Sequence, residues 1–257
     1  MLIATSITQA NERRRVVDVH GQEYLLREFV GAVPQRGTYV EGNETNDNGL
    51  PQGFLVSQPP GSVTPPHFHE TNQFQVFVGG SGRLGKRRAD PVTVQFAGGH
   101  TPYGPIAAEE RGVQYFTLRQ AWDPGAKYLP AMRGRLARGR QRQRLAPQVE
   151  RPAASVLGRL EAPAIETLIA LEADGLGAEL VRLGPGMRCV RPGGGGGQYQ
   201  VVIGGTLVHD GEDLRRLSCR FATADERECE LEAGGDGLAV LVLRFPALDR
   251  AGEGTGP

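Results

Sequence analysis

The residues best suited to chemistry lie in the segment 61–80, which reads GSVTPPHFHETNQFQVFVGG. His67 and His69 are two positions apart, so both imidazoles point to the same side if this segment is a β-strand. Two neutral imidazoles that converge in this way supply half of a typical metal site. Gln73, at the start of the next expected strand, could add an amide oxygen. The spacing therefore indicates a candidate metal site on His67, His69 and Gln73.

The same segment resembles the first sequence motif of the cupin superfamily, G-x5-H-x-H-x3-E-x6-G. Gly61, His67, His69 and Gly80 stand at the motif positions with the motif spacing. The departure is Gln73, where the family usually has glutamate.

The segment 98–104, GGHTPYG, resembles the second cupin motif more weakly, because that motif usually ends in P-x-G-x-x-H. Alignment of the strands places Tyr103 at the usual histidine position, and His100 lies three residues earlier. If the resemblance holds, a divalent metal is bound by His67, His69 and Gln73. Either His100 or Tyr103 would complete the site, with His100 favoured.

Iron is the favoured ion, with nickel, copper, manganese and zinc as alternatives. A glutamine in place of glutamate leaves the ligand set uncharged, so the pocket should favour anionic small-molecule substrates. The expected catalytic residues are Tyr103, as proton donor or substrate hydrogen-bonder, and Gln75, which shares the inward strand face with Gln73. The simpler interpretation is that these polar groups only hydrogen-bond one another.

An internal repeat defines the elements that must position these residues. Residues 73–80 read QFQVFVGG and residues 198–205 read QYQVVIGG, an offset of 125 (198 − 73). Short alternating segments separated by Gly and Pro turns favour strands. The sequence therefore predicts an all-β protein with two tandem cupin-type jelly-roll barrels. The expected divisions are an N-terminal domain over 1–130, an Arg-rich linker over 131–152 and a degenerate C-terminal domain over 153–257.

The second copy lacks the candidate metal ligands. An offset of 125 from His67 and His69 leads to Pro192 and Gly194. Alignment of the later glycine pairs, Gly98-Gly99 with Gly234-Gly235, further suggests that this copy has lost the loop that carries His100 and Tyr103. Its expected role is to pack against the first barrel, as a second subunit would in a dimer. The sequence leaves open whether the whole chain also forms a homodimer.

Composition excludes several function classes. Lys plus Arg number 29 and Asp plus Glu number 29, so no overall charge favours nucleic acid. The linker contains seven arginines, which we interpret as a solvated segment that pairs with acidic residues of a barrel. No apolar run is long enough to span a membrane, and neither an export signal nor a paired cysteine pattern is evident. These features predict a cytoplasmic protein.

Three functions remain. The leading hypothesis is a metal-dependent enzyme that acts on a small organic metabolite, with a non-haem metal dioxygenase favoured. A redox-neutral lyase or isomerase is the first alternative, and a non-catalytic cupin that binds a small ligand is the second. Arg119 and Arg244 occupy equivalent positions of the repeat, which suggests a structural ion pair in each copy, although Arg119 could bind a substrate carboxylate.

Overall fold

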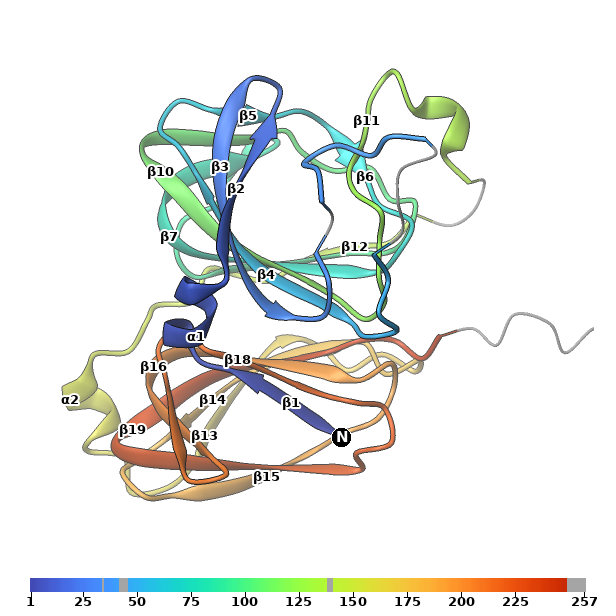
Figure 1. The fold of residues 1–257 in the computed structure, drawn as a ribbon. Coiled ribbons are helices and arrows are strands. Elements are labelled where there is room, and N and C mark those ends of the chain that lie inside the picture. The colour runs from blue at the N-terminus through green and yellow to red at the C-terminus, as the bar shows by residue number, and fades with distance from the viewer. Residues whose placement is uncertain (34, 42–45, 138–140, 249–257) are drawn as a thin grey trace, which may run out of the picture.

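The computed structural model describes residues 1–33, 35–41, 46–137 and 141–248. The described chain forms two antiparallel β-barrels of jelly-roll type, stacked one above the other (Figure 1). The all-β prediction is therefore confirmed.

The first barrel is a nine-stranded sheet with the order β12-β9-β7-β10-β4-β3-β2, in which β5 also pairs with β10 and β8 with β7. A separate two-stranded ladder, β11-β6, lies at its open end. The strands are β2 Arg14–Val19, β3 Gln22–Val30, β4 Gln52–Gln58, β5 Val63–Thr64, β6 His67–Phe68, β7 Gln73–Leu84, β8 Arg87–Arg88, β9 Thr93–Ala97, β10 Ile106–Arg119, β11 Lys127–Tyr128 and β12 Gln143–Leu145.

The second barrel is an eight-stranded sheet with the order β1-β18-β16-β19-β14-β13, in which β15 pairs with β19 and β17 with β16. Its strands are β1 Leu2–Thr5, β13 Ala164–Ile169, β14 Gly177–Leu183, β15 Arg188–Pro192, β16 Gln198–His209, β17 Glu212–Arg215, β18 Cys219–Ala222 and β19 Glu228–Arg244. The short helices are α1 Ile7–Glu12, η1 Arg133–Arg135 and α2 Ala154–Leu157.

Two strands cross the domain divisions expected from the sequence. The first strand of the chain, β1, pairs with β18 of the second barrel, Leu2 opposite Ala222. Strand β12 comes from the segment predicted as a linker, and it pairs with β9 of the first barrel, Gln143 opposite Ala97. Each barrel therefore includes a strand from outside its predicted range.

Strand registers confirm the repeat and correct one inference from it. Ile106 pairs with Thr64 in the first barrel, and Leu231 pairs with Cys189 in the second, both 125 residues later. The offset therefore holds through the segment that we predicted to be missing. The second copy retains this loop, and the predicted deletion is wrong: Gly234-Gly235 corresponds to residues 109–110, not to Gly98-Gly99.

Three apolar clusters divide the core. One lies inside the first barrel and includes Phe77 and Tyr115, and another lies inside the second and includes Val202 and Leu231. The third contains outward side chains of both barrels, such as Phe116 and Leu241. Because these residues alternate with inward ones along the strands, each barrel buries the outer face of the other, as the sequence predicted.

The arginines around β12 pair with acidic side chains. Arg142 contacts Asp174 and Glu172 of the second barrel, and Arg144 Nε lies 2.8 Å from Glu172 Oε1. This agrees with the interpretation of a segment that pairs with a barrel; Arg138 and Arg140 lie outside the described residues. No helix in the described part of the chain has the length and apolar character needed to cross a membrane.

Candidate functional site

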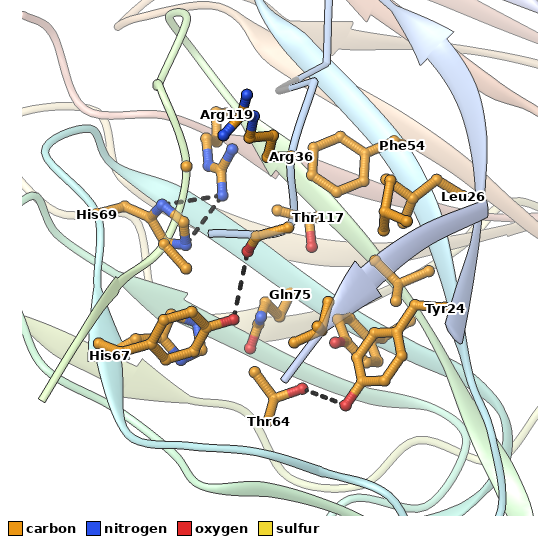
Figure 2. Close-up of a pocket in the computed structure, with 18 of the residues that line it drawn as sticks. Tyr24, Leu26, Arg36, Phe54, Thr64, His67, His69, Gln75, Thr117 and Arg119 are labelled. Carbon is orange, nitrogen blue, oxygen red and sulfur yellow. Dashed lines mark hydrogen bonds between the residues drawn. The ribbon is translucent and has the colours of Figure 1, made fainter. Parts of the chain in front are cut away.

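A cavity opens inside the first barrel. We name it the histidine cavity, because both predicted histidines line it (Figure 2). Its apolar wall includes Val17, Leu26, Phe54 and Val56, and its polar wall includes Tyr24, Thr64, His67, His69, Gln75, Tyr103, Tyr115, Arg119 and Tyr128. An apolar cavity with a few convergent polar groups is the usual form of a small-molecule site.

Backbone pairing on both sides fixes His67. It pairs with Tyr128 across the β6–β11 ladder, and its backbone exchanges hydrogen bonds of 3.1 and 3.0 Å with Tyr103. The Nδ1 atom of His67 lies 2.7 Å from the carbonyl oxygen of Pro65. A carbonyl only accepts, so Nδ1 carries the hydrogen and Nε2 keeps the lone pair. Burial, together with the neighbouring His69, lowers the pKa of His67 to about 3.

His69 is oriented by a buried carboxylate. Its Nδ1 donates to Asp123 Oδ1 at 2.7 Å, so its Nε2 also keeps a lone pair. Burial and the nearby Arg119 lower the pKa of His69 to about 4, and the imidazole is therefore neutral at neutral pH. Burial alone would raise the pKa of Asp123, but its interactions with His69, which include a hydrogen bond, and the charge of Arg119 outweigh it and hold this pKa well below its usual range.

Arg119 is the buried cation of this cavity, with 2% of its surface exposed. Its Nη2 lies 3.0 Å from Nε2 of His69, the nitrogen that keeps the lone pair, and 3.1 Å from Nδ1. Its Nη1 donates to Gln52 Oε1 at 2.8 Å and its Nε to Gln73 Oε1 at 3.2 Å. Its guanidinium also lies over the ring of Phe54.

The positive charge of Arg119 is only partly balanced within the protein. Asp123 Oδ1 lies 4.0 Å from Arg119 Nη1, and this carboxylate also accepts from His69 and from the backbone of Glu70 and Gly125. The other polar partners of Arg119 are uncharged. Arg36 also lines the cavity and adds a second positive group, so the cavity is suited to an anion (Figure 2).

The donor set, as it stands, does not fit a divalent metal ion. Both imidazoles have the orientation of metal ligands, because each uses Nδ1 for another hydrogen bond. The Gln73 oxygen, however, is already an acceptor for Arg119. An ion bound to His69 Nε2 would lie about 2 Å from that nitrogen, directly against the guanidinium. Among the described residues, no group of three or more His, Cys, Asp or Glu side chains could bind a metal.

His100 lies apart from the other predicted ligands. Its ring nitrogen Nδ1 accepts from the backbone of Ala137 at 3.2 Å, its ring lies near Phe68, and it does not line the cavity. Its backbone has φ of 56° and donates to the carbonyl oxygen of His69 at 2.7 Å. His100 therefore supports the histidine strand through its backbone, and the structure does not support it as the fourth ligand.

Tyr103 occupies the position that His100 was expected to take. The centroids of the Tyr103 and His67 rings are 4.5 Å apart, and the Tyr103 hydroxyl accepts from Gln73 Nε2 and, at 3.4 Å, from Gln75 Nε2. Burial raises the pKa of Tyr103 well above its usual value, so the phenol stays protonated. The structure thus brings together His67, His69, Gln73, Gln75 and Tyr103.

Two groups of this site could not be found from sequence motifs. Asp123 orients His69 from a position 54 residues further along the chain, and Arg36 reaches the cavity from a loop with no motif. Arg119 was considered only through its equivalence with Arg244.

Structural comparison gives the class of fold. No protein-family profile matches the sequence, and no curated protein sequence matches it significantly. A candidate dioxygenase from Nostoc punctiforme has a TM-score of 0.58 and 12% identity, over 98% of this chain and 81% of that chain. An oxalate decarboxylase from Lactobacillus farciminis, in complex with formate, has a TM-score of 0.57 and 11% identity over 95% and 86%.

A bacterial pirin from Escherichia coli, in complex with nickel(II), has a TM-score of 0.53 and 11% identity, over 96% of this chain and all of that chain. These proteins have the cupin fold, and this chain has the same fold in its two-barrel form. At such low identity the comparisons establish the fold alone.

Proposed function

We propose that the first barrel binds a small organic anion in the histidine cavity, and that Arg119 forms an ion pair with its anionic group. The position of Arg119 carries this proposal: a buried guanidinium lines the cavity, and its nearest carboxylate is shared with three other donors. Burying a cation without a full counter-charge is costly in free energy, and an anionic ligand that pairs with Arg119 would offset part of this cost.

The other polar groups suit this ligand. His67 and His69 present neutral rings, and the Tyr103 hydroxyl can donate a hydrogen bond, since its two contacts with Gln73 and Gln75 use it as acceptor. The wall of Leu26, Phe54 and Val56 would pack against the carbon skeleton. Among the comparison proteins, the oxalate decarboxylase, with formate bound, is named for a small carboxylate substrate.

Calorimetric titration tests this proposal. Chelator-treated protein would be titrated with oxalate, malonate, succinate and benzoate in the presence of EDTA. We expect saturable, one-to-one binding of at least one carboxylate, and no binding of the corresponding neutral amide. Absence of binding by every acid, or binding that appears only after a metal ion is added, would overturn the proposal.

A metal-dependent enzyme, with the dioxygenase favoured from the sequence, is the second candidate. The observation in its favour is that both imidazoles keep Nε2 free of a hydrogen. It requires Arg119 to leave His69. Elemental analysis of protein purified without a metal-affinity tag, beside a His67→Ala/His69→Ala variant, tests it. Near-stoichiometric metal that is lost in the variant would favour this candidate.

A further inference from the structure

A second cavity adjoins the first barrel on the other side of Tyr103. Gln95 is its buried polar group, and Lys86 and Arg87 lie exposed at its rim. We name it the glutamine chamber; its lining residues are Leu84, Gly85, Lys86, Arg87, Gln95, Pro102, Tyr103, Gly104, Gln143, Arg144 and Leu145. Tyr103 lines both cavities, so the two meet at this side chain.

The glutamine chamber contains a buried amide without a partner. Gln95 is 1% exposed, and neither its Nε2 nor its Oε1 has a hydrogen-bond partner among the described residues. Gln75 stands directly opposite on the neighbouring strand and lines the histidine cavity, and its Oε1 is also buried and without a partner. A buried amide atom left unpaired costs roughly 1–3 kcal/mol, so such atoms call for an explanation.

The second barrel pairs the equivalent glutamine oxygen internally, although Gln200 Nε2 and both amide atoms of Gln198 are buried there without a partner among the described residues. Gln200 and Arg220 occupy the equivalent cross-strand positions, 125 residues after Gln75 and Gln95. There Arg220 Nε donates to Gln200 Oε1 at 2.5 Å. In the first barrel an amide replaces the guanidinium, and both oxygens lack a donor. Gln75 and Gln95 line cavities, which Gln198 and Gln200 do not, so a ligand can reach them and supply the missing donor.

We propose that the glutamine chamber is a second subsite, which binds hydroxyl groups of the anion bound at Arg119. The ligand would therefore be a hydroxylated organic acid. Its carboxylate pairs with Arg119, and its hydroxyl groups donate to Oε1 of Gln75 and Gln95 and accept from Gln95 Nε2. No carboxylate lines the glutamine chamber within the described chain, and Arg87 and Lys86 at the rim favour an acid. This inference rests on the proposed binding of an anion in the histidine cavity.

Matched pairs of acids test the subsite. Gluconate would be compared with hexanoate, and tartrate with succinate, by calorimetric titration of the wild type and of Gln95→Leu. We expect the wild type to bind the hydroxylated acid of at least one pair about tenfold more tightly, as one or two net hydrogen bonds supply. Gln95→Leu should lose most of this preference, since only the contact with Gln75 is left. Gln198→Leu is the matched control, because it removes another buried glutamine amide, in the second barrel and outside both cavities.

Three outcomes separate the two proposals. A wild type that binds both members of each pair equally overturns the glutamine chamber as a subsite and leaves the anion site intact. A hydroxyl preference of undiminished size in Gln95→Leu does the same. If no acid of either pair and none of the simple carboxylates binds, the anion site itself is overturned, and the subsite with it.

Discussion

The two barrels place the same arginine at the same position and give it different partners. Arg119 and Arg244 stand opposite Gln73 and Gln198 in equivalent registers. Arg244 Nη2 lies 2.7 Å from Glu179 Oε1, so its charge is paired inside the protein. The position of Glu179 corresponds to Phe54 in the first barrel, because these residues pair with Val242 and Thr117, again 125 apart. In the second barrel, a carboxylate therefore pairs with the arginine. In the first barrel, the arginine lines a cavity instead.

Two barrels of the same fold therefore need not contain the same site. The second barrel has Val202, Leu231 and Val240 in its interior and keeps its arginines in internal pairs. The first barrel keeps an arginine whose pairing is incomplete, and two incompletely paired amides that line cavities. The comparison therefore predicts that the second barrel contributes stability and that the first barrel binds the ligand.

The largest expected effect concerns the core between the barrels. Phe116 is fully buried in the cluster that also contains Leu241. Phe116→Ala should lower the free energy of unfolding by about 3–5 kcal/mol, because it removes a buried aromatic ring and leaves a cavity. Urea unfolding followed by circular dichroism and by tryptophan fluorescence would measure it. Two separated transitions in the wild type would contradict a shared core.

Replacement of the equivalent arginines should affect ligand binding in the first barrel and stability in the second. Arg119→Met should weaken carboxylate binding by about 10- to 100-fold, because a hydrogen bond to a charged group contributes roughly 1.5–3 kcal/mol. Arg244→Met, the matched variant, should leave affinity unchanged and lower stability. Titration calorimetry and thermal unfolding of both variants test this. Equal affinity of Arg119→Met and the wild type would contradict it.

A carboxylate introduced at position 54 should pair with Arg119, as Glu179 pairs with Arg244 in the second barrel. Phe54→Glu places a carboxylate where Glu179 stands in the second barrel, beside Arg119. The new ion pair should lower carboxylate affinity about tenfold or more, because the ligand must compete with it. Phe54→Gln is the control of similar shape. If Phe54→Glu binds the acid as well as Phe54→Gln does, Arg119 is not the group that the ligand contacts.

The smallest expected effect is a difference in acid stability. Burial would raise the pKa of Glu179, but hydrogen bonds from Arg191 and Arg244 outweigh it and lower the pKa. A lowered folded-state pKa means that the pair stabilises the fold above the ordinary glutamate pKa of about 4.3, and that this contribution is lost as pH falls further.

Glu179→Gln should reduce the loss of stability as pH falls below the ordinary glutamate pKa of about 4.3, because the amide does not titrate. Chemical unfolding at several pH values would measure this difference. An identical pH dependence of the wild type and Glu179→Gln would contradict the inferred pairing.

Much of the fold could be predicted because β-strands alternate. The inward set of Gln73, Gln75 and Phe77 and the outward set of Phe74 and Val76 follow from a period of two residues, and the structure agrees with both. The glycine pairs misled the alignment of the second copy, since glycines mark turns and bulges that can shift along a sheet. The strand registers of the structure corrected this error. The short repeats of the sequence alone could not fix the alignment in this segment.

The candidate site was predictable only in its local part. His67, His69 and Gln73 lie close in sequence, so their convergence follows from strand geometry. The contact of Arg119 with His69 joins residues 50 positions apart, and that of Asp123 with His69 joins residues 54 apart. Such pairings depend on tertiary structure. His100 does not line the cavity; its backbone has a positive φ, and its ring accepts a hydrogen bond from the backbone of Ala137.

Strand β1 has a consequence for the order in which the chain can fold. It is synthesised before either barrel, yet its partner β18 lies more than two hundred residues later. During synthesis the first barrel can assemble from its own strands, while β1 has no edge to join until β18 has left the ribosome. Once β18 has emerged, its edge is open until β1 pairs with it, and open strand edges promote aggregation. Separate expression of residues 1–152 and 153–257 would leave this edge permanently uncovered.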